Sequence, residues 1–282
     1  MKKKIMAVLV AAGMVVSLAA CGGSSQTATG TAESAAETVE SAAESVASEV
    51  ASEDAELVTV TEGKLTMSTN AAFPPYEMTT DSGDLEGIDI EVAGAIAKKL
   101  GLELQVDDMD FDAALLAAQQ GKSDIVMAGV SVTEERQKVM EFSDPYATGV
   151  QVIIVKEDSD IASVENLDGK MIGTQRGTTG NIYCTDDYGE DHVTTYDNGL
   201  TAVQALMNGQ VDCVVIDQEP AKAFVAANQG LKILDTEYVS EDYAIGMAKG
   251  NTALQSAVNK ALAELQEDGT VQSIVDKYIA AK

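Results

Sequence analysis

From residue 64 onward, the apolar positions follow two periodicities, one typical of strands and one typical of helices. In chain order, the predicted elements are a strand in KLTMST, a helix in IEVAGAIAKKL, a strand in ELQVDD, a helix in DAALLAAQQ and a buried strand in DIVMAG. Asp89 is expected to cap the first helix, and Gly101 and Gly121 are expected to end the two helices. Strands that alternate with helices predict an α/β architecture.

Part of this pattern occurs a second time later in the chain. The segment ALLAAQQGKSDIVMAG resembles AVQALMNGQVDCVVID, because each reads as an apolar helix, then Gly-x-x-Asp, then a buried strand. Gly121 aligns with Gly209, and Asp124 aligns with Asp212. The repeat predicts two similar α/β lobes, with chance similarity of two helix-turn-strand units as the alternative.

The repeat places Gly129 and Asp217 at corresponding carboxyl ends of two predicted strands. In open α/β sheets, ligands bind along this edge. Two such edges facing each other would form an interdomain cleft. We therefore expect the recognition chemistry to come from residues that follow these strands.

Arg136 follows the first of these strand ends, in the stretch VSVTEER. A guanidinium binds a carboxylate through two parallel hydrogen bonds, and a hydrogen bond to a charged group contributes about 1.5–3 kcal/mol. Ser131 and Thr133 add hydroxyls on the same turn, and either of them can instead cap the following helix. The alternative for Arg136 is a surface position, paired with Glu134 or Glu135.

Asp217 and the loop at residues 177–180, GTTG, complete the candidate set. Asp217 can accept hydrogen bonds from an ammonium, or it can cap the helix predicted in QEPAKAFVAANQ. The GTTG loop is expected to enter a helix whose free N–H groups favour an anion, with simple loop flexibility as the alternative. An arginine with amide donors suits a carboxylate and an aspartate suits an ammonium, so together they predict an α-amino acid as the ligand.

The sequence has no pattern typical of a catalytic or metal site. Its one histidine, His192, lies in the polar stretch YGEDHVTTY, where solvation is expected. No Ser-His or Cys-His pairing with a supporting motif and no metal-ligand spacing is present, and GTQRGTTG lacks the lysine of a phosphate-binding loop. Cys184 and Cys213 can be bridged in an oxidising compartment, although Cys213 in VDCVVI suits a buried free thiol. We expect no metal, no cofactor and no enzyme activity.

The N-terminal part of the chain differs from the rest in composition. Residues 1–20 combine three lysines with an uncharged run shorter than the roughly 20 apolar residues of a membrane span, as in a signal peptide. The segment LAAC resembles a bacterial lipobox, which predicts acylation of Cys21 and a stable membrane anchor, with a plain secretory peptide as the alternative. Residues 21–57 are expected to form the lipidated N-terminus and a disordered acidic linker.

The net charge of the chain limits the classes of molecule that it can be expected to bind. The sequence holds 46 acidic and 18 basic residues, a formal net charge of −28, and removal of residues 1–20 takes away three lysines and no acid. An excess of negative charge of this size argues against nucleic acid and against anionic lipid surfaces as partners.

From about Gly63 to Lys282, the chain resembles the polar amino-acid-binding proteins of ABC importers, solute-binding family 3, which includes glutamine- and histidine-binding proteins. The resemblance rests on TNAAFPPYE, GIDIEVAGAIAKKLG, MDFDAALLAAQQGKSDIVMAG, VSVTEERQKVMEFSDPY, QRGTTG and VVIDQEPA, in this order. It implies a two-lobed periplasmic-binding-protein fold of type II, with the ligand in the interdomain cleft. It also implies lobe 1 at residues 58–147 and 243–282, and lobe 2 at residues 148–242.

The resemblance further implies roles for individual residues. Arg136 and the Thr179 amide would hold the α-carboxylate of the ligand. Asp217, Ser131 and the Gly129 carbonyl would hold its α-ammonium. Closure of the lobes would bury both charged groups, so nearly every charge must be paired.

The side-chain pocket is implied by the same family pattern. Phe73 and Phe111 match aromatic positions that sandwich the ligand side chain, with core packing as the alternative. Asn70 matches a position that is often aspartate, and Gly180 replaces a glutamine of the basic-amino-acid binders. Because an amide cannot neutralise a cation, a neutral polar ligand is favoured, while Glu77 as a nearby acid keeps basic ligands open.

Taken together, the sequence predicts an extracytoplasmic, lipid-anchored, monomeric receptor that delivers an α-amino acid to ABC permease subunits in the membrane. An enzyme resembling cyclohexadienyl dehydratase is the alternative on the same fold, and it needs no ammonium partner. A sensory ligand-binding domain would be fused to a transmembrane signalling segment, which we do not find after residue 21.

Overall fold

The computed structural model describes residues 57–279. The predicted signal peptide, the acylation of Cys21 and the linker up to residue 56 lie outside the described residues. The strands are β1 (Lys64–Thr69), β2 (Ala72–Phe73), β3 (Glu77–Thr79), β4 (Leu85–Glu86), β5 (Glu103–Asp108), β6 (Ile125–Val126), β7 (Met140–Phe142), β8 (Ala147–Lys156), β9 (Ile172–Gln175), β10 (Val193–Tyr196), β11 (Cys213–Asp217), β12 (Leu231–Ile233), β13 (Val239–Tyr243) and β14 (Gly246–Ala248). The helices are α1 (Ile88–Lys99), α2 (Phe111–Gln119), α3 (Glu134–Val139), α4 (Thr179–Tyr188), α5 (Gly199–Met207), α6 (Gln218–Ala227), α7 (Thr252–Glu267) and α8 (Thr270–Tyr278), with short 3-10 turns η1 (Val164–Asn166) and η2 (Glu190–His192).

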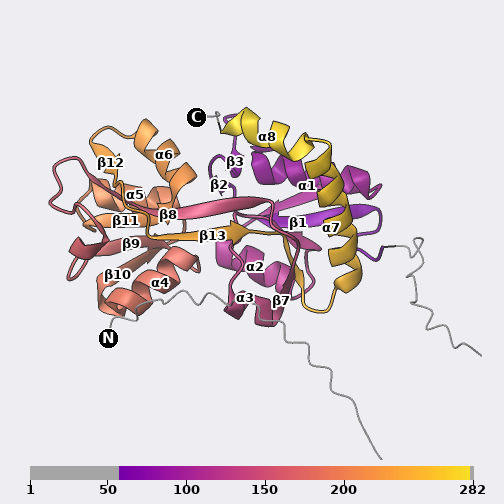
Figure 1. The fold of residues 1–282 in the computed structure, drawn as a ribbon, viewed down its shortest axis with the longest axis horizontal. Coiled ribbons are helices and arrows are strands. Elements are labelled where there is room, and N and C mark those ends of the chain that lie inside the picture. The colour runs from indigo at the N-terminus through magenta and orange to yellow at the C-terminus, as the bar shows by residue number, and fades with distance from the viewer. Residues whose placement is uncertain (1–56, 280–282) are drawn as a thin grey trace, which may run out of the picture. The chain divides into compact units, whose positions relative to one another are not determined.

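These elements form two main sheets that lie side by side in Figure 1. The first has the strand order β5-β1-β6-β14-β7, and the second has the order β10-β9-β11-β8-β12, with β13 also paired to β8. A small third sheet joins β2, β3 and β4. We call the parts built on the first and second main sheets the first lobe and the second lobe. The strands β8 and β13 pair antiparallel and run between them.

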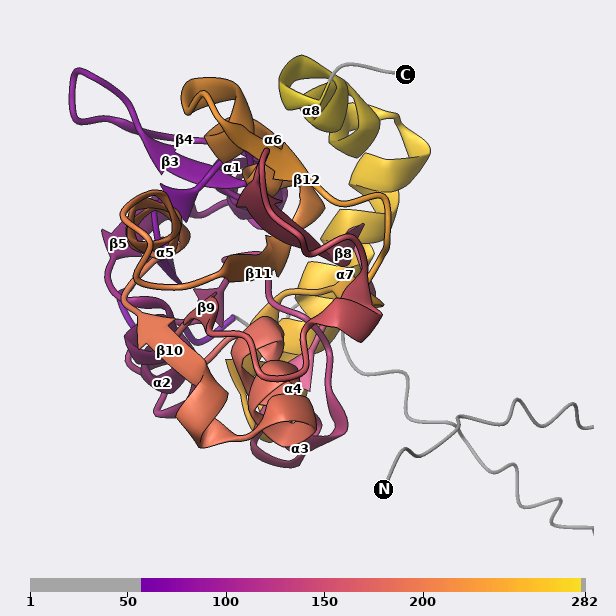
Figure 2. The same cartoon turned by 90° about the vertical axis from the view of Figure 1, so that its left-hand side faces the viewer.

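Helices cover both faces of each main sheet. In Figure 1, α1 and α8 lie above the first sheet and α2 lies below it, and α1, α7 and α8 pack against one another. In the second lobe, α5 and α6 pack on one face and α4 on the other, as Figure 2 shows from the side. Each lobe is therefore a three-layered α/β unit, as the alternating pattern predicted.

The strand β11 shows why the second sheet is apolar on both faces. Val214 and Ile216 belong to the core cluster beneath α5 and α6. Cys213 and Val215 point to the opposite cluster, which contains Cys184 of α4. Successive side chains of a strand alternate between faces, so a strand covered on both sides is apolar throughout. Burial of each valine or isoleucine contributes about 1.5–3 kcal/mol.

The repeat seen in the sequence has a structural counterpart in each lobe. Gly121 and Gly209 both follow a helix with a positive φ, of 65° and 73°. Asp124 accepts a hydrogen bond of 2.7 Å from a backbone N–H of β1. Asp212 accepts one of 2.7 Å from the backbone N–H just before β9. In both lobes, the aspartate thus ties the strand after the helix to a neighbouring parallel strand.

Two local predictions are wrong. Asp89 does not cap the first helix, because α1 begins at Ile88 and Gly87 occupies the N-cap position with φ 136°. A Cβ atom at Gly87 would lie 2.2 Å from the carbonyl oxygen of Tyr76, so only glycine allows this close approach. The strand predicted to end at Gly129 is also shorter, since β6 covers only Ile125–Val126 and the chain then turns toward the positive φ of Gly129.

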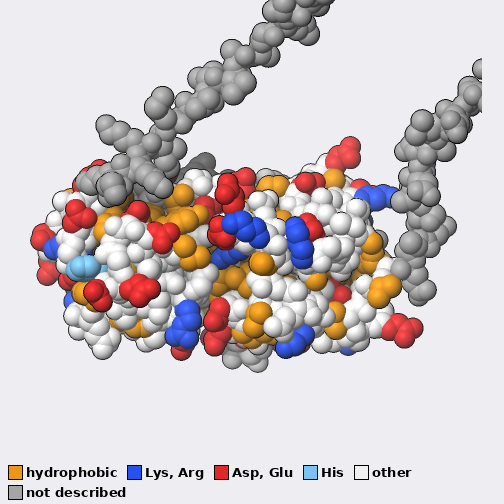
Figure 3. All heavy atoms as spheres, turned by 90° about the horizontal axis from the view of Figure 1, so that it is seen from below, with side chains coloured by type: hydrophobic (Ala, Val, Ile, Leu, Met, Phe, Trp, Pro, Cys, Tyr) orange, Lys and Arg blue, Asp and Glu red, His pale blue; other side chains and the backbone are white. Residues whose placement is uncertain are grey.

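The surface of the described part is mixed in character. On the face in Figure 3, acidic and basic side chains lie next to one another and among apolar ones. Within residues 57–279, none of the helices combines the length and the apolar character that crossing a bilayer requires.

Candidate functional site

A narrow cavity lies between the two lobes and is lined by residues of both. The residues that line it include all eight that the sequence predicted for ligand contact: Asn70, Phe73, Phe111, Gly129, Ser131, Arg136, Thr179 and Asp217. Its other lining residues are Glu77, Ala128, Gln175 and Thr178. The chain thus brings together, from both lobes, side chains up to about 150 positions apart.

Arg136 lies in the first turn of the short helix α3. Thr133 caps this helix, because its side chain accepts a hydrogen bond of 3.2 Å from the backbone N–H of Arg136. Only 8% of Arg136 is exposed. The surface position that was the alternative for Arg136 is therefore wrong, and Glu135 instead pairs with Lys138 at 2.6 Å.

The guanidinium of Arg136 bridges the two lobes. Its Nη1 donates to the carbonyl oxygen of Ser131 at 2.8 Å, and its Nη2 donates to the carbonyl oxygen of Gly177 at 3.2 Å. Its Cζ lies 5.5 Å from the centroid of the Phe111 ring, in cation–π contact. Burial lowers the pKa of Arg136, and the negative charge of Glu241 opposes that effect. A buried arginine with donors left in its fork is suited to bind a carboxylate.

Asp217 lines the same cavity from the second lobe, at the end of β11. It occupies the N-cap position of α6, but its side chain makes no capping hydrogen bond, so the interpretation as a helix cap is wrong. Its Oδ2 accepts a hydrogen bond of 2.8 Å from Nε2 of Gln151, and its Oδ1 accepts one from the hydroxyl of Tyr243. Burial raises the pKa of Asp217 to about 6. Its carboxylate is held in place by two neutral donors and lines the cavity.

The GTTG loop enters a helix, as predicted. Thr178 caps α4 by accepting a hydrogen bond of 3.2 Å from the backbone N–H of Asn181. Thr179 is the first residue of the helix, so its N–H belongs to the first turn, where N–H groups have no partner within the helix. Thr178 and Thr179 line the same cavity as Arg136, whose guanidinium bonds to Gly177 just before them, and both the helix start and the guanidinium favour an anion there.

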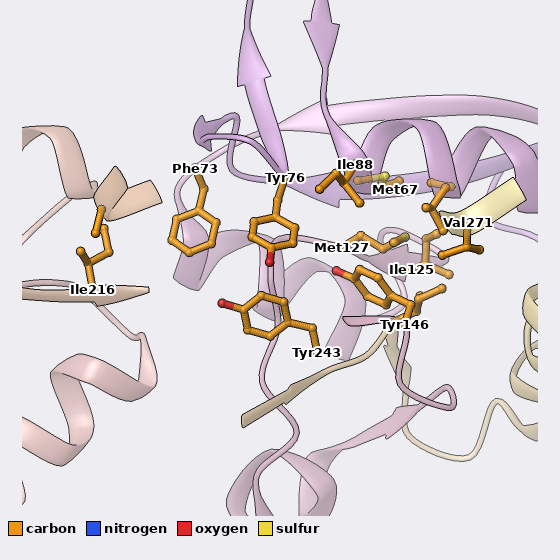
Figure 4. Packing of buried hydrophobic residues seen from close by; sticks show 14 of the residues in the cluster. Met67, Phe73, Tyr76, Ile88, Ile125, Met127, Tyr146, Ile216, Tyr243 and Val271 are labelled. Carbon is orange, nitrogen blue, oxygen red and sulfur yellow. The ribbon is translucent and has the colours of Figure 1, made fainter. Parts of the chain in front are cut away.

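An aromatic wall closes another side of the cavity. The Phe73 ring stacks on Tyr76 at 5.9 Å between centroids, and in Figure 4 it lies between Tyr76 and Ile216 of the second lobe. Gly129 has φ 55°, and a Cβ atom there would lie 2.8 Å from the Phe73 ring. Phe73 and Phe111 each belong to a buried core cluster and also line the cavity. Each ring therefore packs in the core on one side and borders the cavity on the other.

Asn70, Gln175 and Glu77 add polar side chains to the cavity lining. The Oδ1 of Asn70 accepts a hydrogen bond of 2.9 Å from Nε2 of Gln175, which links the two lobes. Both carboxyl oxygens of Glu77 are buried, and no residue of the described part donates a hydrogen bond to them. Burial, followed by the negative charge of Asp89, raises the pKa of Glu77 well above its usual range. A polar ligand side chain would meet an amide pair and an acid here.

Sequence reasoning missed several residues of this site. Gln175 lies within the quoted QRGTTG motif, but no feature of that motif marked it as a lining residue. Gln151 and Tyr243 hold Asp217 from β8 and β13, and Glu241 contacts Ser131 and Thr179, all from segments that read as ordinary strands. Their roles depend on the pairing of two strands separated by about ninety residues.

The remaining chemically reactive candidates lie away from the cavity. His192 ends the turn η2 and does not line the cavity. Cys184 and Cys213 are both buried and are free thiols, and burial raises the pKa of each to about 12. The buried free thiol expected at Cys213 is therefore what the structure contains.

Comparison with known proteins relates this geometry to a family. Residues 65–281 match the sequence profile of bacterial extracellular solute-binding proteins, family 3. The chain is similar to the L-cystine-binding protein TcyJ of Escherichia coli (strain K12), with 31% identity over 222 residues that cover 78% of this chain and 84% of that protein. It is also similar to the arginine-binding extracellular protein ArtP of Bacillus subtilis (strain 168), with 32% identity over 224 residues that cover 78% and 87% of the two chains.

Solved structures of the same architecture include an ancestral arginine-binding protein bound to glutamine. Its chain is 42% identical to this one, with a TM-score of 0.75, and the match covers 78% of this chain and all of the other. The arginine-, lysine-, histidine-binding protein ArtJ from Geobacillus stearothermophilus is 29% identical, with a TM-score of 0.74 and coverage of 78% and 96%.

Proposed function

Because the chain belongs to family 3 of the bacterial extracellular solute-binding proteins, we propose that it captures a free α-amino acid outside the cytoplasm for import by an ABC transporter. The family resemblance expected from the motifs is confirmed. Relatives named for binding cystine, histidine, arginine and glutamine support an amino acid as the ligand. The observation that carries the proposal is the buried pair of Arg136 and Asp217, one from each lobe, lining one cavity.

In this proposal, the ligand lies between the two buried charges. Its carboxylate accepts hydrogen bonds from the Arg136 guanidinium and the Thr179 N–H. Its ammonium donates to the Asp217 carboxylate, the Ser131 hydroxyl and the Gly129 carbonyl. Because an unpaired charge is costly away from water, a ligand that lacks either group would leave a buried charge without its partner.

The side chain of the ligand would extend between Phe73 and Phe111 toward Asn70, Gln175 and Glu77. The two amides and the acid support a polar side chain, since each can donate or accept a hydrogen bond. Burial raises the pKa of Glu77 and so disfavours its charged form, which supports a neutral polar ligand over a cationic one.

Several finer parts of the prediction are proposals as well. We propose acylation of Cys21 as the anchor, a monomer as the working state, and binding without chemical conversion of the ligand. We also propose lobe 1 at residues 58–147 and 243–282 and lobe 2 at residues 148–242. The antiparallel pairing of Ala147 with Tyr243 supports these limits, because it brings both crossing points together.

Titration calorimetry of the purified protein against the twenty amino acids tests this function. We expect at least one polar amino acid to bind with a Kd of about 1 μM or below, roughly 8 kcal/mol or more, and to be recovered unchanged. The same amino acid without its α-amino group should bind at least about a hundredfold more weakly. Binding no tighter than about 1 mM for all twenty, or conversion of the bound compound, would contradict the proposal.

A further inference from the structure

Glu241 lies in β13, one of the two strands that run between the lobes, and its backbone pairs with Gly149 of β8. Its side chain is half-buried. It does not line the cavity, and the segment EYVSEDY around it reads as an ordinary polar strand. Its contacts nevertheless reach both sides of the site.

The carboxylate of Glu241 accepts hydrogen bonds from three hydroxyls. The Oγ of Ser131 donates to Oε2 at 3.2 Å, and Oγ1 of Thr179 donates to the same oxygen at 2.6 Å. The hydroxyl of Tyr183 donates to Oε1 at 2.8 Å. Ser131 belongs to the first lobe, whereas Thr179 and Tyr183 lie on α4 of the second lobe. A single carboxylate therefore joins the two lobes beside the cavity.

These bonds decide which way two of the cavity hydroxyls point. A hydroxyl has one proton to donate and lone pairs that accept. Because Ser131 and Thr179 give their protons to Glu241, their oxygens are left as acceptors. At Thr179, one such acceptor is already occupied, because Nε2 of Gln151 donates to its Oγ1 at 3.4 Å. An oxygen that can only accept suits an ammonium and does not suit a carboxylate.

The charge of Glu241 also matches the site. Among the charges around Arg136, that of Glu241 has the largest effect in favour of the buried cation. It also opposes the ionisation of Asp217. Glu241 thus stands close to both poles of the site, and its negative charge is complementary to the guanidinium and to a ligand ammonium.

We propose that Glu241 is a positioning residue that joins the closed lobes and fixes the Ser131 hydroxyl as an acceptor for the ligand ammonium. This inference rests on the proposed function, because it assigns how one part of the same site is held. Charged hydrogen bonds of this kind are stronger than neutral ones, so loss of the charge weakens the closed state.

The test replaces Glu241 by Gln, which keeps the shape and removes the charge. We expect Glu241→Gln to bind the amino acid that the wild type binds about 10- to 100-fold more weakly by calorimetry, the range for a charged hydrogen bond. Asp242→Asn is the matched control, since Asp242 is the next residue of the same strand, carries the same charge and is exposed. Its Kd should stay within about twofold of wild type.

A double-mutant cycle separates positioning from a general loss of structure. If Glu241 acts through the Ser131 hydroxyl, Glu241→Gln should weaken binding much less in a Ser131→Ala background than in the wild type. If Glu241→Gln does not fold, the variant Tyr183→Phe replaces it in the test, because it removes one of the hydroxyls that donate to Glu241. It should weaken binding about 3- to 10-fold, by about 1 kcal/mol.

Unchanged or tighter binding by Glu241→Gln, or full additivity with Ser131→Ala, overturns the role of Glu241 while leaving the proposed function in place. If Glu241→Gln does not fold, unchanged binding by Tyr183→Phe overturns it in the same way. A wild-type protein that binds no amino acid contradicts the proposed function and this inference with it.

Discussion

Asp217 combines a raised pKa with the role proposed for it as partner of the ligand ammonium, and together they predict that ligand binding depends on pH. Burial raises the pKa of its carboxyl group to about 6, although Tyr243 and Gln151 donate to its ionised form. An ammonium needs the ionised form, so affinity should be full above pH 7 and should fall as the pH drops through 6. We expect a loss of about tenfold in affinity between pH 7.5 and pH 5, measured by calorimetry.

The variant Asp217→Asn gives the control for this prediction. It should bind weakly at every pH and lose most of the dependence, because no carboxylate remains at that position to titrate. Asp89, whose pKa burial also raises to about 6, would still be present in this variant. A pH dependence that persists in Asp217→Asn would therefore point to another buried acid, Asp89 or Glu77, rather than to Asp217.

Glu77 should weaken the fold at high pH. Its pKa is raised in the folded state, so its contribution to stability is fully present below the unfolded pKa and is lost as the pH rises through the folded pKa. Glu77→Gln cannot ionise. Without ligand, this variant should be more stable than wild type by about 1–3 kcal/mol at pH 8, and the difference should vanish near pH 4.

Denaturant unfolding at the two pH values measures this effect. Glu103→Gln on β5 is the control, because it removes the same charge from an exposed position. If Glu77→Gln is no more stable than wild type at pH 8, the buried carboxyl must find a partner that offsets its burial.

Single residues were predictable where the sequence places them at the end of an element. Arg136 and Asp217 follow apolar strands, and the edge rule for α/β sheets brought both to the cavity. Tyr243 and Gln151 could not be found in this way, since each reads as part of a strand. Their contact with Asp217 arises only when β8 and β13 pair.

At the scale of elements, the strands between the lobes contain a sensitive position. Gly149 of β8 lies against the ring of Tyr243, and a Cβ atom there would lie 2.3 Å from the ring. Gly149→Ala should therefore displace Tyr243, which donates its hydroxyl to Asp217. We expect a loss of about 1–3 kcal/mol in stability from overpacking, together with at least about tenfold weaker ligand binding.

Gly94→Ala provides the matched comparison. Gly94 lies inside α1, where the nearest atom to an added Cβ is a side-chain carbon of Leu104 at 3.9 Å. This variant should gain up to about 1 kcal/mol, because alanine is favoured over glycine in a helix interior. Thermal unfolding and calorimetry of both variants measure the contrast, and equal effects would show that the Tyr243 contact is unimportant.

Most elements of the first lobe were predictable from periodicity alone. The strands in KLTMST and ELQVDD and the helix in DAALLAAQQ lie where expected, since each has a regular apolar pattern and a clear stop. The Asp89 cap failed because the pattern cannot show that Gly87 passes against a backbone carbonyl. Asp89 instead accepts hydrogen bonds inside the core from Tyr146 and from the Gly129 N–H.

At the scale of the whole molecule, the two-lobed fold class is confirmed. Its prediction came from two kinds of evidence, the internal repeat and the family resemblance. The internal repeat predicted two similar lobes from helix, glycine and aspartate spacing. The return of the chain to the first sheet at β14 came only from the family resemblance. The strand β14 has only three residues, too few for a hydrophobic pattern that would show which sheet it joins. Its pairing with β6 and β7 depends on contacts between residues far apart in the sequence.

The place of β14 determines the order in which the molecule can be completed. This strand lies between β6 and β7, yet it is synthesised after every strand of the second lobe. Until Gly246 has been made, the nascent protein holds β6 with an unpaired edge, a surface that attracts other chains. The first sheet is therefore completed last, and a chain cut short before Gly246 would leave an unpaired strand edge that favours aggregation.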